Sequence, residues 1–264
     1  MNPPKECDSL FARERLVTGC EAMKEMLVGL MDSKGKVAEE VHALRKLGKS
    51  LRGGFTLFGL EKSSALEIQS IGRLLSGPRD AVSRLSTWNK LAWAGDPKVS
   101  AAIHGLLDQQ THSAARRPPP ETIHWCVERV EAARQELMGL HEEHLQQFIA
   151  KGLERLEKRT FKRCRKLDHQ EVEDFHEARK SVKAWLGAVG FLPEGAMPVD
   201  PGFHLLAEIL GDENDLATLS VWLKGHGFTQ RFAPDLWKTI KAARKRLQKE
   251  AIRNAGMLTP SWAG

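Results

Sequence analysis

The sequence predicts an all-α protein. Apolar residues recur every three or four positions along most of the chain, as expected for amphipathic helices. No run of β-branched residues alternates with polar ones, so the sequence carries no strand signal. Charged residues make up 28% of the chain and aromatic residues 6%, which suits helices better than a β-sandwich. With 264 residues, the chain can bury a substantial core.

The first half of the chain contains four segments with helical periodicity. Pro78 lies inside the third segment and predicts a break near Ser76 and Gly77, because proline cannot donate the helical hydrogen bond. Asp96 followed by Pro97 marks the start of the fourth segment. The four segments cover residues 8–31, 36–58, 63–93 and 97–113, with a turn at 32–35.

The segment ARRPPPE at 115–121 is the clearest boundary in the chain, because consecutive prolines do not continue a helix. We expect it to link two units, residues 8–114 and 122–256, each built as a four-helix bundle. The helical segments of the second half cover residues 120–167 (which would be the longest helix), 170–191, 202–225 and 234–254.

The composition and the N-terminal sequence indicate where in the cell the protein is located and what kind of partner it has. The chain has 40 Lys and Arg against 34 Asp and Glu, and its isoelectric point is near 9.2, so the distribution of basic residues is more informative than their moderate excess. Four scattered cysteines form no CxxC pair, which indicates neither a disulfide framework nor a zinc site. The N-terminus lacks the apolar region of a signal peptide, and the apolar run at 26–31 is too short to span a bilayer. We therefore expect a cytoplasmic protein without a membrane partner.

The strongest functional signal is a basic helix face that occurs twice. At roughly 100° per residue, the basic side chains of the second helical segment fall in one arc opposite its apolar side. The same spacing returns 134 positions later. The first face consists of His42, Arg45, Lys46, Lys49 and Arg52, and the second of His176, Arg179, Lys180 and Lys183.

A second pair of similar segments supports an internal duplication. LLSGPRDAVSRL around Asp80 resembles ILGDENDLATLSVWL around Asp215, at an offset of 135. Two segments with nearly the same offset predict a duplicated unit of about four helices. If the two units face each other, both basic faces line one cleft. Further basic residues assigned to this predicted cleft are Arg73, Arg79, Lys158, Lys162, Arg165, Lys238, Lys241 and Lys245.

These motifs resemble the CHAD family, whose name stands for conserved histidine α-helical domain. The matching motifs are HxxRK from His42, RD at 79–80, HxxRKxxK from His176 and ND at 214–215, and the resemblance covers about residues 8–254. Proteins of this family fold as two four-helix bundles around a basic cleft that binds inorganic polyphosphate, and they associate with polyphosphate granules. The resemblance implies the same fold, ligand and granule association for this chain.

The chain departs from the family pattern mainly in its first half. Gly48, Gly53 and Gly54 stand where helix formers or further basic residues are common, and residues 98–113 carry almost no charge. We expect the two adjacent glycines to weaken or bend the end of the helix over 36–58. We also expect the first half to hold the ligand less firmly than the second.

A row of cations suits polyphosphate, which carries charge on each phosphate and has no base to recognise. Arg binds phosphate oxygens in pairs and Lys provides a mobile point charge, while a bound polyanion would favour the charged form of His42 and His176. Because neutralised phosphates release counterions, affinity should fall steeply with salt. The chain has no P-loop and no carboxylate cluster for two Mg²⁺ ions, so we expect neither catalysis nor a metal or cofactor.

Two other functions fit parts of the sequence. The same basic cleft could hold an RNA or DNA backbone, although most of the tryptophans lie at apolar helix positions and not where bases would stack. Glu-x-x-His pairs at 121–124 and 173–176, together with Glu208, allow a di-metal carboxylate enzyme. The cations around 173–176 disfavour that second alternative, because positive charge beside a metal ion is repulsive.

Overall fold

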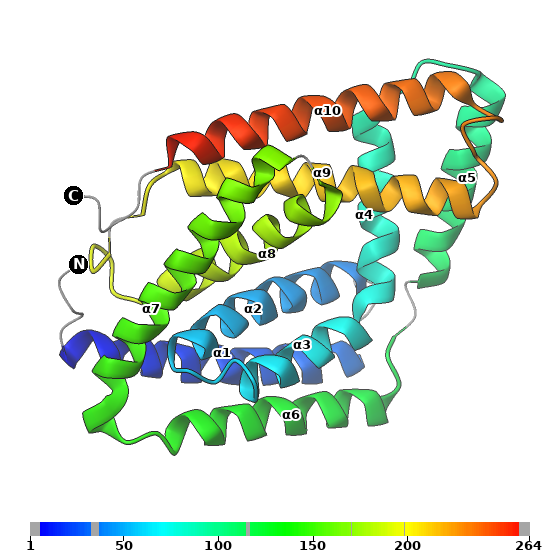
Figure 1. Cartoon of the computed structure of the whole chain (residues 1–264). Helices are drawn as coiled ribbons and strands as arrows, with labels where there is room; N and C mark the ends of the chain where they lie inside the picture. Colours follow the sequence, from blue (N-terminus) through cyan, green and yellow to red (C-terminus); the bar gives the residue numbers. More distant parts are fainter. Residues whose placement is uncertain (1–5, 33–36, 115–116, 170, 198, 259–264) are drawn as a thin grey trace.

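The regular secondary structure of the described part of the protein is helical. The computed structural model describes residues 6–32, 37–114, 117–169, 171–197 and 199–258, and in these ranges it contains helices and no strand, which confirms the predicted all-α class (Figure 1). The elements are α1 (Glu6–Asp32), α2 (Val37–Leu57), α3 (Ser64–Leu74), α4 (Ser76–Leu91), α5 (Pro97–Ala114), α6 (Pro120–Met138), α7 (Glu142–Arg165), the 3₁₀ helix η1 (Lys166–His169), α8 (Val172–Val189), α9 (Gly202–Gly225) and α10 (Pro234–Met257).

Most helix boundaries lie close to the predicted ones. The predicted break in the third segment is confirmed: α3 ends at Leu74, α4 begins at Ser76, and Pro78 falls in the first turn of α4, where its missing N–H costs no helical hydrogen bond. Of the predicted turn at 32–35, Asp32 is the last residue of α1, and residues 33–35 lie outside the described residues, as do the first residues of the proline-rich segment.

The prediction of one long helix over 120–167 is wrong. The chain forms two helices here, because α6 ends at Met138 and α7 begins at Glu142. His141, just before α7, has an extended backbone with φ −65° and ψ 131°, and Gly139 is the C-cap residue that follows α6. The apolar period resumes within three residues, so a pattern alone does not detect this turn. Gly139, a residue common just after a helix, was the available signal.

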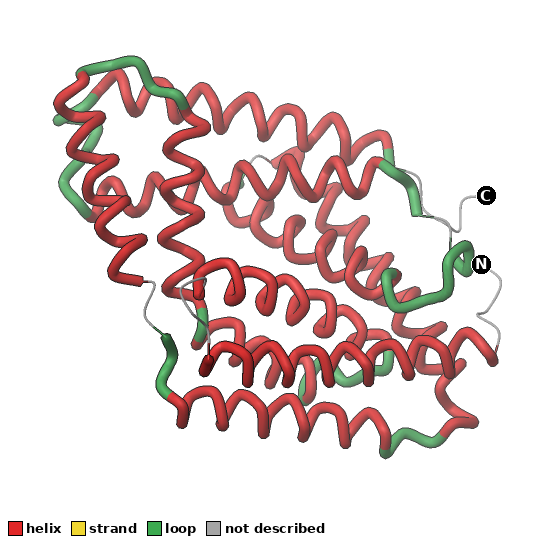
Figure 2. The backbone as a smooth tube through the Cα atoms, turned by 180° about the vertical axis from the view of Figure 1, so that it is seen from behind, coloured by secondary structure: helices red, strands yellow, loops and turns green. Residues whose placement is uncertain are grey.

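Two hydrophobic cores hold the helices together. The larger core contains buried side chains of α1, α2, α3, α6, α7, α8 and the first part of α9. The smaller core joins α4 and α5 to the later part of α9 and the first part of α10. Figures 1 and 2 show α4 and α5 at one end of the molecule, where α9 ends and α10 begins. Each core draws residues from both sides of the proline-rich segment. Side chains of the predicted units 8–114 and 122–256 therefore pack into shared cores. The division into two duplicated four-helix bundles remains a prediction.

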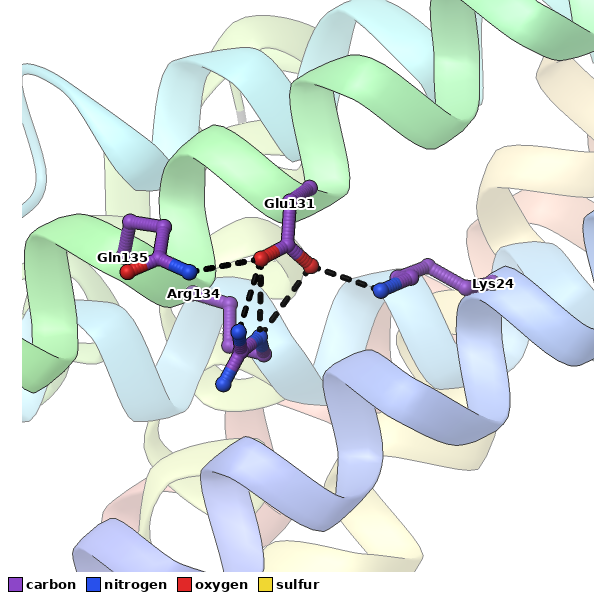
Figure 3. Close-up of polar contacts among 4 residues, drawn as sticks. All are labelled: Lys24, Glu131, Arg134 and Gln135. Atoms are coloured by element: carbon purple, nitrogen blue, oxygen red, sulfur yellow. Dashed lines mark hydrogen bonds and ion pairs between the residues drawn. The ribbon is translucent and has the colours of Figure 1, made fainter.

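A polar cluster at the surface ties α6 to α1. The Glu131 carboxylate accepts hydrogen bonds from Arg134 and Gln135 on its own helix, each at 2.7 Å, and from Lys24 of α1 at 2.6 Å (Figure 3). These hydrogen bonds, that of Arg134 above all, hold the pKa of Glu131 far below its usual range. The cluster supplements the apolar contact between the two helices.

Helices α2 and α8 cross at close range. A Cβ atom on Gly53 of α2 would lie 2.6 Å from the backbone nitrogen of Ala188 and 2.7 Å from the carbonyl oxygen of Ala184. No side chain fits in that space, so a glycine is needed for the helices to approach this closely. Helix α2 continues through Gly53 and Gly54 to Leu57, and these glycines serve packing between the helices.

Cys20, Cys126 and Cys164 are buried free thiols. Burial raises the pKa of Cys20 and Cys164 to about 12 and that of Cys126 to about 11. Within the described ranges, every helix is too short or too polar to traverse a lipid bilayer.

Candidate anion-binding cleft

The crossing of α2 and α8 forms one wall of a basic cleft. A hollow of about 430 Å³ lies between α2 and α8, with α3 and α7 closing its sides. We call it the central cleft. Seven of its lining residues are basic: Lys49, Arg52, Arg159, His176, Arg179, Lys180 and Lys183. Among the described lining residues, Glu61 supplies the single carboxylate.

Apolar packing fixes which way the basic faces point. On α2, Leu44, Leu51 and Phe55 are fully buried, so the basic side chains between them turn away from the core. On α8, Val182 and Trp185 are buried in the same way. The two apolar stripes face the same core, and the two basic faces therefore emerge side by side at the central cleft.

Arg52 of α2 lines this cleft close to two other arginines. Burial lowers the pKa of Arg52, and the positive charges of Arg73 and Arg159 lower it further. Its buried Nε atom has no hydrogen-bond partner among the described residues. A buried donor without an acceptor is costly, and so is an array of like charges. An anion bound between these guanidinium groups would remove both costs.

Arg159 of α7 also lines the cleft and also lies close to other positive charges. Its pKa is lowered first by burial and then by the charges of Arg155 and Arg163, while Glu61 and Glu177 act in the opposite direction. The acids nearby are already engaged. Glu61 pairs with Arg155 at 3.1 Å, so its charge is shared with a side chain outside the lining.

Two basic side chains of α8 have ordered positions at the edge of the cleft. The Nδ1 atom of His176 is 3.1 Å from the amide oxygen of Asn214 on α9. Because an amide oxygen only accepts, Nδ1 carries the proton, and this hydrogen bond orients the ring. Lys180 forms an ion pair with Glu177, one turn earlier on the same helix, and that pair lowers the pKa of Glu177.

A second basic hollow continues from the central cleft along α2 and α3. It has a volume of about 220 Å³ and shares Lys49 and Arg52 with the central cleft. We call it the first-half hollow. Arg45 and Arg73 add two further cations to its lining. Arg45 donates to the carbonyl oxygen of Gly72 at 2.5 Å and lies 3.7 Å from the Asp80 carboxylate, so both groups help to fix its position.

The structure brings together about half of the predicted site residues. The central cleft and the first-half hollow include Arg45, Lys49, Arg52, Arg73, His176, Arg179, Lys180 and Lys183. His42 and Lys46 are exposed on α2 and are not among these lining residues. The side chain of Arg79 lies outside the described residues.

The residues predicted on α7 face elsewhere. Lys158, Lys162 and Arg165 are exposed, and Lys158 pairs with Glu154 at 2.5 Å on the outer side of the helix. The residue of α7 that lines the cleft is Arg159, which is not among the predicted site residues. The sequence contained a sign of this position, because Arg159 lies one turn after Arg155, at the edge of the apolar stripe that contains Leu156.

The lysines predicted on α10 also lie away from the central cleft. Lys238 lines a separate hollow of about 620 Å³ between α4, α9 and α10, together with Lys90, Arg246, Asp212 and Asp215. Lys241 and Lys245 are exposed on α10. The long basic helix at the end of the chain therefore contributes to a different surface, because α10 packs mainly on α9 and not on α2 or α8.

The di-metal alternative finds no ligand cluster in the described part of the chain. No group of three or more His, Cys, Asp or Glu side chains there is placed to hold a metal ion. The two Glu-x-x-His pairs lie on α6 and α8, and these helices pack against different neighbours. The Nδ1 atom of His176 is committed to Asn214.

The tryptophans on which a base could stack are mostly inside the protein. Trp88, Trp185, Trp222 and Trp237 are at most 9% exposed, in agreement with their apolar positions in the sequence. Trp185 belongs to the larger core beneath the cleft, and the other three belong to the smaller core. The described lining of the central cleft therefore offers cations and no indole ring on which a base could stack.

Comparisons with known proteins agree with this fold. The family model of the CHAD domain matches residues 22–224 of the chain. The crystal structure of the CHAD domain from the plant Ricinus communis superposes with a TM-score of 0.66 at 17% sequence identity, covering 98% of this chain and 95% of that one. PptA from Streptomyces chartreusis superposes with a TM-score of 0.50 at 14% identity, covering 96% of this chain and 99% of that one. No curated protein sequence matches the chain. At these identities the two superpositions show a shared fold.

Proposed function

Because the chain belongs to the CHAD family, we propose that it binds inorganic polyphosphate in the central cleft and the first-half hollow, without catalytic turnover. Binding of this kind would attach the protein to polyphosphate granules. The proposal rests on the family and on the charge of the two hollows, which together contain nine basic residues from α2, α3, α7 and α8.

The observation that carries the proposal is the state of Arg52. Its guanidinium group is held in a partly buried position beside two other cations, and its Nε donor has no acceptor among the described residues. Such an arrangement lowers the stability of the empty protein and is repaid by a ligand that brings several negative oxygens at once. Linear polyphosphate has this character along its whole length.

The composition of the lining favours polyphosphate over nucleic acid. Non-specific binders of single strands combine basic grooves with aromatic platforms for the bases. The described lining of the two hollows supplies cations, small residues and aliphatic side chains, and its single ring is that of His176. A ligand without bases makes full use of such a surface.

The lining also favours binding over catalysis. Phosphoryl transfer needs metal ions bridging the phosphates and a group that positions the nucleophile. Glu61 is the one lining carboxylate among the described residues, and it is paired with Arg155. His176 is held by Asn214 at the edge of the cleft. We therefore assign no catalytic residue, metal or cofactor to this site.

Calorimetric titration of the full chain with polyphosphate of several lengths tests the proposal. Arg52→Ala combined with Arg179→Ala should weaken binding by about 100-fold or more, because each removed charge-assisted contact is worth roughly 1.5–3 kcal/mol. Circular dichroism should show unchanged helicity. Lys98→Ala, which removes an exposed cation at the start of α5, is the matched control and should bind like the wild type.

Competition with RNA separates the two ligands. Long-chain polyphosphate should displace a labelled single-stranded RNA at a far lower phosphate concentration than RNA needs to displace polyphosphate. The reverse order of potency would transfer the assignment to nucleic acid. Equal affinities of the wild type and the double variant for polyphosphate would remove the central cleft from the proposal.

A further inference from the structure

The central cleft is flanked by two hollows that occupy equivalent places in the two halves of the chain. The first-half hollow contains Lys49 of α2, and a hollow of about 460 Å³ on the other side contains Lys183 of α8. We call the latter the second-half hollow. Lys49 and Lys183 are 134 positions apart and both also line the central cleft. Each hollow is thus a continuation of the central cleft toward one half of the protein.

Some of the other residues that line the two hollows also correspond in pairs. Gly72, Arg73 and Ser76 line the first-half hollow. At an offset of 135, their counterparts Ala207, Glu208 and Gly211 line the second-half hollow. This is the offset of the repeat around Asp80 and Asp215. The two ends of the groove are therefore the same structural position, filled by different residues.

The charge at these two ends is opposite. Where the first half has Arg73, the second half has Glu208, and Asp212 and Asp215 follow on the same face of α9. Residues spaced by four and three positions share one side of a helix, so the three carboxylates form a row. Lys90 lies 3.5 Å from Asp212 and offsets part of this charge. Glu208 is exposed in the hollow beside Lys183.

We propose that Glu208 and the carboxylates beside it end the polyanion-binding groove on the α9 side, so that a long ligand leaves the protein past Arg73. A phosphate chain extending from Lys183 toward α9 meets negative charge within one turn of the helix. Like charges at that separation repel, whereas the opposite direction offers Arg45 and Arg73. The groove thus holds a ligand segment of limited length and releases the remainder in one direction.

This inference rests on the proposed polyphosphate function and specifies it. It also runs against the expectation that the first half holds the ligand less firmly. The first-half hollow has the additional cations, whereas the second-half hollow adds mainly carboxylates to Lys183. Duplication supplied two equivalent ends, and the substitution of an acidic residue at one of them gives the site a direction that the ligand itself lacks.

The test compares short and long ligands on charge variants of the groove. Glu208→Arg restores the cation found at the equivalent position, and Arg73→Glu creates a carboxylate at the other end. Glu128→Arg, on the exposed side of α6, produces the same change of net charge away from the groove and is the control. Tripolyphosphate and long-chain polyphosphate are titrated at several salt concentrations, with helicity measured for each variant.

Glu208→Arg should bind long-chain polyphosphate several-fold more tightly than Glu128→Arg does, with nearly equal affinities of the two for tripolyphosphate. A plot of its log affinity for the long ligand against log salt concentration should become steeper by roughly 0.7–0.9, because one additional phosphate contact releases about one more counterion. Arg73→Glu should weaken binding of the long ligand.

Equal gains in Glu208→Arg and Glu128→Arg would overturn the inference, because net charge alone would then explain them. The wild type could bind and Arg52→Ala fail to bind, while Glu208→Arg leaves the long-chain affinity unchanged. That result would support polyphosphate binding in the groove and would reject the proposal that the groove ends at Glu208. A wild type without affinity for either ligand would overturn the proposed function together with this inference.

Discussion

Gly53 and Gly187 lie 134 positions apart and meet where their helices cross. A Cβ on Gly53 would contact the backbone of Ala184, and a Cβ on Gly187 would lie 3.2 Å from the Cα of Ser50. Ser50 and Ala184 are themselves 134 positions apart. The two contacts are thus the same contact made twice, as in an isologous interface between two copies of one unit. The central cleft lies beside this crossing, so its geometry depends on these two glycines.

Gly53→Ala should destabilise the protein by about 2 kcal/mol, within the range of overpacked sites. The added methyl group would lie less than 3 Å from backbone atoms of α8, which cannot rotate away as a side chain could. The change is measured as a lower midpoint of urea denaturation with an unchanged slope. Polyphosphate affinity should fall as well, since separating the helices widens the cleft.

Gly29→Ala is the matched control for this substitution. Gly29 is also a helical glycine, but a Cβ built on it meets no atom within 4 Å. Here alanine should stabilise by about 0.5–1 kcal/mol, because glycine is the poorer helix former. If both substitutions raise stability alike, the close approach of α2 and α8 does not exist in solution.

Arg159→Ala should weaken polyphosphate binding by roughly 10-fold or more, whereas Lys158→Ala should leave it within about twofold. The two residues are neighbours on α7, but Arg159 lines the central cleft and Lys158 is paired with Glu154 on the exposed side. Titration of both variants with one polyphosphate preparation measures the difference. The opposite ranking would show that α7 is rotated relative to its described position.

The contrast between these neighbours shows what the sequence can predict. On α2 and α8, strong apolar stripes define the buried side, so the direction of Arg52 and Arg179 follows from the pattern. On α7, basic residues surround the helix, and the spacing of Lys158, Lys162 and Arg165 is as regular as that of Arg155 and Arg159. Which of these basic residues face the cleft depends on which helices cover α7, and this is a property of the tertiary structure.

Tertiary arrangement also explains the other differences from the prediction. Lys238, Lys241 and Lys245 form a clear basic face, but α10 packs on α9 and turns this face away from the central cleft. The turn at Gly139 interrupts the predicted long helix without a change in apolar period. The function of Gly53 required the position of α8, since the sequence alone shows only a poor helix former inside a helix.

Stability should decrease in acid partly through Glu131. The pKa of this carboxyl is lowered in the folded protein from its usual value near 4.5, so its stabilising contribution is present above that value and is lost as the pH falls through and below it. Glu131 is one-third exposed, and solvent screening limits the contribution to about 1 kcal/mol. Glu131→Gln should therefore lower the free energy of unfolding at pH 7 by about that amount.

The difference between wild type and Glu131→Gln should shrink as the pH falls from 5 to 3, because the wild-type carboxyl becomes protonated in the unfolded chain first. Urea denaturation at a series of pH values provides the measurement. Glu143→Gln, whose carboxyl is largely exposed beside His144, is the control and should change little with pH. A difference that stays constant across this range would show that the cluster with Lys24 and Arg134 does not form.

Arg52→Met should make the ligand-free protein more stable by about 1 kcal/mol while greatly weakening polyphosphate binding. Methionine keeps much of the buried volume and removes a guanidinium group whose charge is disfavoured by burial and by Arg73 and Arg159. Urea denaturation at low ionic strength measures the gain. With polyphosphate added, the order should reverse, because ligand binding stabilises the wild type in proportion to its affinity.

Arg155→Met separates this effect from a general benefit of removing arginines. Arg155 donates to the carbonyl oxygen of Thr56 at 2.9 Å and pairs with Glu61, so its loss should destabilise the protein. If Arg52→Met also destabilises the ligand-free protein, Arg52 has a structural partner, and the unsatisfied cation on which the polyphosphate proposal rests is absent. If Arg52→Met gains stability and loses affinity, Arg52 contributes to ligand binding and lowers the stability of the ligand-free protein.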